Sequence, residues 1–287
     1  MLRTQGILIL ILAAVVSAAN FSGTSAFEYT KRAVDFGPRP PGSMANRQLQ
    51  NYILAELKNR GCQITEDAFQ AKTPKGDFAM RNILCKFKGT SGRAIAITGH
   101  FDTKLFPGRK FVGANDGGSS TGLLLELAHA LQGETRKDDV YVVFLDGEEA
   151  TREEWEGEDN LYGSRHLAEV WRKDGTLRQL KALINVDMIG DKNLNVNQEM
   201  ESTASLRQLV NKAASDLGYQ AYFSGQQVHE DDDHTPFLKQ GVTALDVIDI
   251  DYEPWHKDTD TMDKVSAKSL DIVGTVIQES IHRLERQ

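Results

Sequence analysis

Two adjacent carboxylates stand at the end of a short apolar segment in the middle of the chain. Residues 140–145 read as a buried strand that leads through Asp146 and Gly147 into Glu148 and Glu149. An ionised carboxylate at the end of a buried strand needs a partner, because burying an unpaired charge is costly. Two neighbouring acids can divide the work, one binding a metal ion while the other transfers protons. The rest of the chain is therefore expected to supply further ligands, pocket walls and substrate contacts around this pair.

Other imidazoles and carboxylates also follow apolar segments. They are His100, Asp102, Asp116, Asp187 and His256. Imidazole and carboxylate together suit zinc and leave room for an open coordination position, whereas two cysteines are too few for a thiolate site. A single strand-end acid such as Asp187 is more often a turn or cap residue, so the whole set carries the signal. Beside a predicted ligand, Glu148 is the natural proton shuttle.

Strand-like and helix-like segments alternate along the chain and predict the fold. Strands are predicted at 94–102, 140–145, 182–187 and 243–248, and helices at 44–59, 121–132, 203–217 and 267–283. Nearly continuous apolar strands separated by helices imply an α/β fold with a mixed, mostly parallel central sheet and helices on both faces. Sites in such sheets form at the carboxyl ends of the strands, which is where these acids and histidines stand.

Length, composition and charge limit the class of protein. The chain has 287 residues, of which 40% are hydrophobic and 26% charged, and its net charge is −8. This composition is ordinary for a globular protein. The acidic balance argues against nucleic acid or an anionic membrane surface as a partner. A single α/β catalytic domain is predicted over residues 27–287.

The first 19 residues have the pattern of a secretory signal peptide. A positive start at Arg3 precedes an apolar stretch at 7–16, and the small residues at 17–19 suit a signal peptidase. The apolar stretch is shorter than the ~20 residues of a membrane-spanning helix. An uncleaved anchor and a periplasmic tether are the alternatives. The mature chain is expected to be secreted or periplasmic and to have no membrane span.

The two cysteines, Cys62 and Cys85, flank a predicted β-hairpin with strands near 62–70 and 78–86. A cross-strand disulfide is geometrically possible there, although such bridges are demanding. In a secreted chain the two can pair, and a pair of buried thiols is the alternative.

The motifs resemble those of the zinc aminopeptidase superfamily. The shared stretches are Gly99-His100-Phe101-Asp102, Asn115-Asp116-Gly117, Glu148-Glu149, Asp187-Met188-Ile189-Gly190 and the late His256. Within that superfamily the chain is more similar to the glutaminyl-peptide cyclotransferases. That similarity rests on 146–150 followed by Trp155, on 161–166, on Asp232-Asp233-His234 with Pro236-Phe237, and on Trp255-His256. The resemblance covers residues from about 36 to the C-terminus.

The resemblance implies one zinc ion, held by Asp116, Glu149 and His256, with Glu148 as general base and acid. Zinc would act as a Lewis acid on the side-chain carbonyl of an N-terminal glutamine. The α-amine of the same residue would attack that carbonyl, ammonia would leave, and N-terminal pyroglutamate would form. The expected partners are peptides or proteins with an N-terminal glutamine.

The resemblance also implies which residues bind the substrate. Asp187 would hold the α-amine, and Asp232 would join a hydrogen-bonded network of acids nearby. Trp155 and Trp255 would wall the pocket for the glutamine side chain.

Two other functions fit part of the pattern. A secreted zinc aminopeptidase would use two metal ions that share Asp116, with His100 and Asp187 as added ligands, and 115–118 looks like the peptidase pattern. The two tryptophans favour the cyclase, because they fill space that the first side chain of a peptide would use. A binding protein with an inactive site is the third possibility, and the intact set of catalytic residues argues against it.

Overall fold

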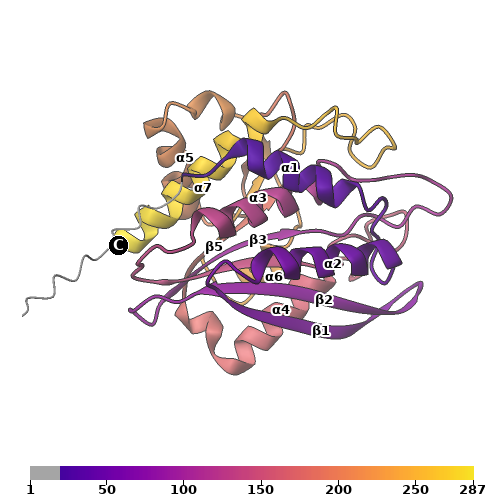
Figure 1. Ribbon diagram of the computed structural model, residues 1–287, viewed down its shortest axis with the longest axis horizontal. Helices are drawn as coiled ribbons and strands as arrows, with labels where there is room; N and C mark the ends of the chain where they lie inside the picture. Colours follow the sequence, from indigo (N-terminus) through magenta and orange to yellow (C-terminus); the bar gives the residue numbers. More distant parts are fainter. Residues whose placement is uncertain (1–19) are drawn as a thin grey trace, which may run out of the picture.

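Six strands form the central sheet of the computed structural model, which describes residues 20–287 (Figure 1). They are β1 (Gln63–Thr73), β2 (Gly76–Phe87), β3 (Ala94–His100), β4 (Asp139–Leu145), β5 (Leu180–Asp187) and β8 (Ala244–Ile248), in the order β1-β2-β4-β3-β5-β8. The β1–β2 and β2–β4 pairs are antiparallel, and the other three pairs are parallel. The predicted mixed, mostly parallel sheet is confirmed. The predicted signal peptide at 1–19 lies outside the described residues.

Helices cover both faces of the sheet, as predicted. One face is covered by α2 (Met44–Leu57), α3 (Gly118–Ala130), α5 (Ala204–Asp216) and α7 (Ala267–Arg286), and α1 (Gly23–Val34) packs on α3 and α7. The other face packs against α4 (Tyr162–Asp174) and the short α6 (Thr235–Leu238). In Figure 1, α1, α3 and α7 lie above the sheet and α4 lies below it. Within residues 20–287, no helix is long and apolar enough to cross a membrane.

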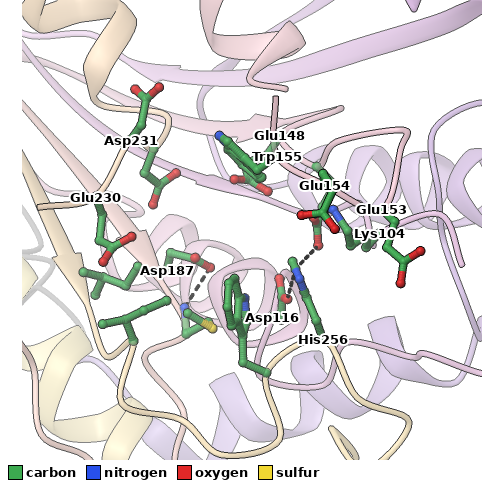
Figure 2. Close-up of a pocket in the computed structure, with 16 residues that line it drawn as sticks. Lys104, Asp116, Glu148, Glu153, Glu154, Trp155, Asp187, Glu230, Asp231 and His256 are labelled. Atoms are coloured by element: carbon green, nitrogen blue, oxygen red, sulfur yellow. Dashed lines mark hydrogen bonds and ion pairs between the residues drawn. The ribbon is translucent and has the colours of Figure 1, made fainter. Parts of the chain in front are cut away.

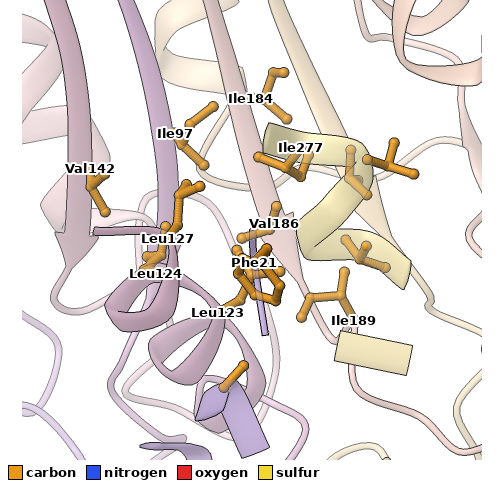
Figure 3. Close-up of a cluster of buried hydrophobic side chains, with 14 of the residues drawn as sticks. Phe21, Ile97, Leu123, Leu124, Leu127, Val142, Ile184, Val186, Ile189 and Ile277 are labelled. Carbon is orange, nitrogen blue, oxygen red and sulfur yellow. The ribbon is translucent and has the colours of Figure 1, made fainter. Parts of the chain in front are cut away.

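The core centres on α3, which is buried on nearly every side. Figure 3 shows Leu123, Leu124 and Leu127 of this helix facing Ile97 and Val142 of the sheet. The helix α1 covers its outer side at close range. A Cβ atom at Gly122 would lie 2.0 Å from Thr30 Oγ1, so only glycine permits this approach of the two helices. This packing fixes α3, whose N-terminus carries the loop with Asp116.

Several elements were not predicted. Helix α1 begins at Gly23, where the Ser22 side chain accepts from the backbone N–H of Ser25, and the predicted domain start at residue 27 lies within this helix. Its buried face is formed by small residues, so it lacks the stripe of large apolar side chains that marked the other helices. The sequence also gave no signal for α6, for the short strands β6 (Gln198–Glu199) and β7 (Gln227–Val228), or for the 3₁₀ turns η1 (Thr176–Gln179) and η2 (Gln220–Tyr222). Elements of two to four residues are too short for a periodic pattern.

Cys62 and Cys85 form a disulfide bond. Cys62 precedes β1, and Cys85 lies in β2 with its side chain in the core. The bond therefore joins the start of the edge strand β1 to β2, the hairpin strand that pairs with β4.

We expect the double substitution Cys62→Ser/Cys85→Ser to destabilise the protein. The two residues are 23 positions apart, and a loop of that size predicts a loss of about 3 kcal/mol in the free energy of unfolding. Guanidinium unfolding of the oxidised protein and of the variant measures the difference. Equal midpoints would show that the bond adds nothing to stability. The cleft described below is remote from the bond, so activity under native conditions should persist.

Candidate functional site

The candidate site lies where the loops after β3, β4, β5 and β8 meet. His100 and Asp187 end their strands, Glu148 and Glu149 follow β4, and His256 comes from the loop after β8. Together with the loop before α3, these segments enclose a cleft of about 400 Å³. Figure 2 shows its lining, with carboxylates converging from several elements. The expected location at the carboxyl ends of the strands agrees with the structure.

Asp116, Glu149 and His256 form one group of donor atoms. One atom from each lies within 4.8 Å of the others, and His256 Nε2 is 3.2 Å from Glu149 Oε1 and 3.4 Å from Asp116 Oδ2. Asp116 Oδ2 is buried and has no hydrogen-bond partner among residues 20–287, whereas Glu149 Oε2 faces the Lys104 ammonium at 3.6 Å. Buried carboxylate oxygens need such a partner or a cation. Two carboxylates and an imidazole fit a zinc ion with one position left open.

Acidic side chains behind this group hold its backbone in place. Asp260 accepts from the backbone N–H groups of Asn115 (2.9 Å) and Asp116 (3.1 Å). Asp102 accepts from the backbone N–H groups of Glu148 (3.1 Å) and Glu149 (3.4 Å). Each acid thereby fixes the loop that carries one of the carboxylate donors. His256 itself has a φ of 54°, a left-handed conformation that non-glycine residues adopt mainly where the surroundings demand it.

His100, Asp116 and Asp187 form a second group with donor atoms within 4.8 Å of one another. His100 Nε2 is 3.1 Å from Asp187 Oδ1 and 3.3 Å from Asp116 Oδ1. Asp116 therefore belongs to both groups. The residues named for the two-metal alternative are thus brought together as closely as those named for a single zinc ion.

Glu148 lies beside both groups and belongs to neither. Its side chain is buried and lines the cleft, with Oε2 3.8 Å from His100 Nδ1. Burial raises the pKa of Glu148 well above its usual range, and the neighbouring carboxylate of Glu149 adds to this, while His100 opposes it. A carboxyl group with a raised pKa can both accept and return a proton near neutral pH.

The two predicted tryptophans lie at the cleft. Trp155 is 37% exposed and Trp255 is 44% exposed, and both line the cavity. Trp255 stacks on His256 with ring centroids 4.3 Å apart. Large aromatic surfaces that remain this exposed beside polar groups are typical of ligand-binding walls.

Asp187 and Asp232 also line the cleft, and both are buried. Burial raises the pKa of Asp232 to about 6, and the nearby carboxylate of Asp187 adds to this shift. All eight residues predicted for catalysis, substrate binding and metal binding therefore gather at one cleft; their roles remain proposals.

Sequence reasoning missed three residues of this region. Lys104 lies under the cleft with Nζ 3.6 Å from Glu149 Oε2. Asp260 binds the loop before α3, and Arg39 supports the same loop from the other side. Lys104 lies two residues after the His100-x-Asp102 motif, and this proximity was the one feature of the sequence that could have indicated its place at the site. Arg39 and Asp260 had none, because their contacts with the loop before α3 are to backbone groups of a distant segment.

Arg39 is fully buried and holds three segments together. Its guanidinium donates to the carbonyl oxygens of Phe101 (3.2 Å), Val112 (2.6 Å), Gly113 (3.1 Å) and Gly37 (3.1 Å). These bonds join the loop after β3 to the loop that leads into Asp116.

We expect Arg39→Met to destabilise the protein by on the order of 3 kcal/mol or more, because each buried carbonyl left unsatisfied costs about 1–3 kcal/mol. Zinc affinity should fall as well, since the loop before Asp116 loses its support. Chemical unfolding measures the first effect and zinc titration the second. Arg47→Met is the matched control, because Arg47 is an exposed arginine on α2. If the two variants unfold alike, Arg39 does not have this supporting role.

Comparison with known proteins connects this site to characterised families. A model of peptidase family M28 matches residues 82–281. A glutaminyl-peptide cyclotransferase of Drosophila melanogaster is 28% identical over 268 residues, which are 84% of this chain and 75% of that one. The crystal structure of a glutaminyl cyclase from an Acidobacteriales bacterium matches with a TM-score of 0.90 and 37% identity, covering 97% of this chain and 99% of that one. A leucine aminopeptidase precursor from Bacteroides thetaiotaomicron matches with a TM-score of 0.85 and 27% identity, covering 93% and 99%.

Proposed function

Because the chain belongs to peptidase family M28 and, within it, to the glutaminyl-peptide cyclotransferases, we propose that it converts the N-terminal glutamine of peptides to pyroglutamate with release of ammonia. As a member of this family it is an enzyme, an acyltransferase. The observation that carries the proposed reaction is the buried group of Asp116, Glu149 and His256 beside Glu148, in a cleft lined by two tryptophans.

The metal would be one zinc ion bound by Asp116, Glu149 and His256. When bound there, zinc supplies Lewis-acid polarisation of the side-chain carbonyl of the glutamine. The support for this assignment is chemical, because Asp116 has a buried oxygen without a hydrogen-bond partner among residues 20–287 and the donor set suits zinc.

Glu148 moves the proton. Its carboxylate takes one proton from the neutral α-amine of the glutamine as the lone pair of that amine attacks the side-chain carbonyl carbon of the same residue. Glu148 then returns that proton to the amide nitrogen, which leaves as ammonia while the ring amide remains. Proton removal and proton return balance, so no other co-reactant is required.

The other cleft residues place the substrate. Asp187 accepts a hydrogen bond from the α-amine and thereby directs the lone pair of the amine toward the carbonyl carbon. Asp232 belongs to the network of acids around Asp187. Trp155 and Trp255 enclose the glutamine side chain and exclude water, which would otherwise compete as the nucleophile. Because amine and carbonyl belong to one residue, holding the side chain folded back contributes much of the acceleration.

The cellular location follows from the same reasoning. Disulfide bonds persist in oxidising compartments, so the bond between Cys62 and Cys85 supports a secreted or periplasmic enzyme. Residues 1–19 would then be its signal peptide. N-terminal sequencing of the protein recovered from its host tests this, and an N-terminus at Met1 would contradict it.

One comparison of substrates tests the reaction. The purified protein is mixed with a glutamine-initiated peptide and, separately, with the same peptide beginning with leucine. We expect the first to lose ammonia and the second to remain intact. Release of leucine from the second would instead support an aminopeptidase.

The aminopeptidase is the second candidate, and the group of His100, Asp116 and Asp187 is the observation that favours it. In that enzyme the two metal ions would share Asp116, and Glu148 would deprotonate a water molecule. About two zinc ions per chain, with a loss of one in His100→Ala, would support this reading.

A further inference from the structure

A row of polar residues crosses the sheet directly beneath the candidate site. Thr98 on β3 pairs in register with Asn185 on β5, which in turn pairs with Asp246 on β8. Thr98 and Asn185 stand two residues before His100 and Asp187, so their side chains point to the same face of the sheet as the site. The next row down on this face is apolar and consists of Ala96, Leu183 and Ala244.

Asn185 connects the members of this row. Its Oδ1 accepts from the Thr98 hydroxyl at 2.8 Å, and its Nδ2 donates to Asp246 Oδ1 at 3.1 Å. The same Nδ2 donates to Asp232 Oδ2, also at 3.1 Å. An ionised Asp232 carboxylate can only accept, so the amide nitrogen must face Asp232 and the amide oxygen faces the Thr98 hydroxyl. The orientation of the Asn185 amide is thereby fixed.

Asp232 is the member of this cluster that reaches the cleft. It lies in the loop before α6, whereas Asn185 lies in the middle of a central strand. One Asp232 carboxylate oxygen accepts from the backbone N–H of Asp233, and the other accepts from Asn185. All four side chains of the cluster, those of Thr98, Asn185, Asp232 and Asp246, are buried. A buried hydrogen bond to a rigid strand therefore determines the direction of a carboxylate carried by a loop.

We propose that Asn185 is a positioning residue for the reaction, which fixes the Asp232 carboxylate at the wall of the cleft. This inference rests on the proposed cyclisation, in which Asp232 belongs to the acid network around the substrate. Without the amide, the Asp232 and Asp246 carboxyl groups would face each other across the gap without their shared donor. Asp232 would lose the bond that ties it to β5 and keep only the backbone N–H of Asp233 from the loop itself, so its carboxylate would turn from its place. The donors of the zinc group, which Asn185 does not contact, would stay.

The first test is Asn185→Leu, which removes the amide and keeps a similar volume. We expect kcat for a glutamine-initiated peptide to fall about 10- to 100-fold, as is typical when a residue that orients a functional group is lost. Zinc content should match the wild type, and KM should change less than kcat. Ile184→Ala is the matched control, because Ile184 is the adjacent residue of β5 and packs into the core on the opposite face. It should lower the melting temperature and leave kcat near the wild-type value.

A double variant separates positioning from stability. Asn185→Leu/Asp246→Leu replaces the donor and one acceptor by apolar groups, so the melting temperature should recover relative to Asn185→Leu. If Asn185 positions Asp232, kcat stays low in the double variant. Recovery of kcat together with the melting temperature would overturn the proposal, and so would a wild-type kcat in Asn185→Leu.

A third measurement does not depend on activity. If the wild-type protein releases no ammonia from any glutamine-initiated peptide, the proposed function fails. The crystal structure of the Asn185→Leu variant still tests the positioning role. We expect the Asp232 carboxylate to be turned from its wild-type direction, and an unchanged direction would overturn the inference.

Discussion

Replacing Glu148 by glutamine is expected to abolish turnover while zinc stays bound. Glutamine keeps the shape of the side chain but cannot accept a proton. Glu148 lines the cleft and lies outside the Asp116, Glu149 and His256 group, so its loss removes proton transfer and leaves the metal donors in place. General acid–base catalysis typically contributes about 10²–10⁴-fold to the rate, so we expect a fall in kcat of at least that order. Ammonia release and zinc content of the same preparation provide the two measurements.

A distant glutamate is the control for the Glu148 substitution. Glu169 is partly exposed on α4 and pairs with Arg172, so Glu169→Gln makes the same chemical change away from the cleft. Its turnover should match the wild type. Retained activity in Glu148→Gln would show that another group transfers the proton. Loss of zinc from that variant would show that Glu148 acts as a ligand.

Replacing His256 by alanine is expected to abolish both zinc binding and activity. His256 is the imidazole of the proposed zinc group, and its loss leaves that group with the carboxylates of Asp116 and Glu149 alone. Several kcal/mol of charge stabilisation would be lost, and each 1.36 kcal/mol is tenfold in rate, so we expect a fall of on the order of 10³-fold or more. Metal analysis after dialysis and ammonia release measure the two effects.

The wild-type protein treated with a chelator provides the comparison for His256→Ala. It should lose activity and regain it on addition of about one zinc ion per chain, whereas His256→Ala should not be restored. His129→Ala is the control variant, because His129 lies on the outer surface of α3 and contacts Glu126. Zinc bound as tightly by His256→Ala as by the wild type would contradict the assignment of this ligand.

The strand ends made most of the site predictable. Each metal-binding candidate follows an apolar segment or precedes a buried helix, and parallel strands bring such ends to one edge of a sheet. Asp116, Glu149 and His256 could therefore be grouped although they lie far apart along the chain. The sequence did not decide whether the site binds one zinc ion or two. The geometry brings His100 and Asp187 as close to Asp116 as it brings Glu149 and His256.

The supporting residues were beyond sequence reasoning. Arg39 binds carbonyl oxygens, and Asp260 binds two backbone N–H groups of a distant loop besides the Tyr252 hydroxyl, so the contacts that matter here leave no side-chain motif. Asn185 sits in an apolar strand, and its role depends on register with Thr98 and Asp246, which only the folded sheet defines. Helix α1 was missed because its contact with α3 depends on small residues such as Gly122 and not on an apolar stripe.

The central claim is that the substrate amine, and not water, attacks the carbonyl carbon. Turnover of a glutamine-initiated peptide in ¹⁸O-labelled water tests this directly by mass spectrometry. An intramolecular attack predicts a product that has lost one ammonia and carries no ¹⁸O. A product with ¹⁸O in a new carboxyl group, either as N-terminal glutamate or as a released amino acid, would contradict the claim and identify the enzyme as a hydrolase.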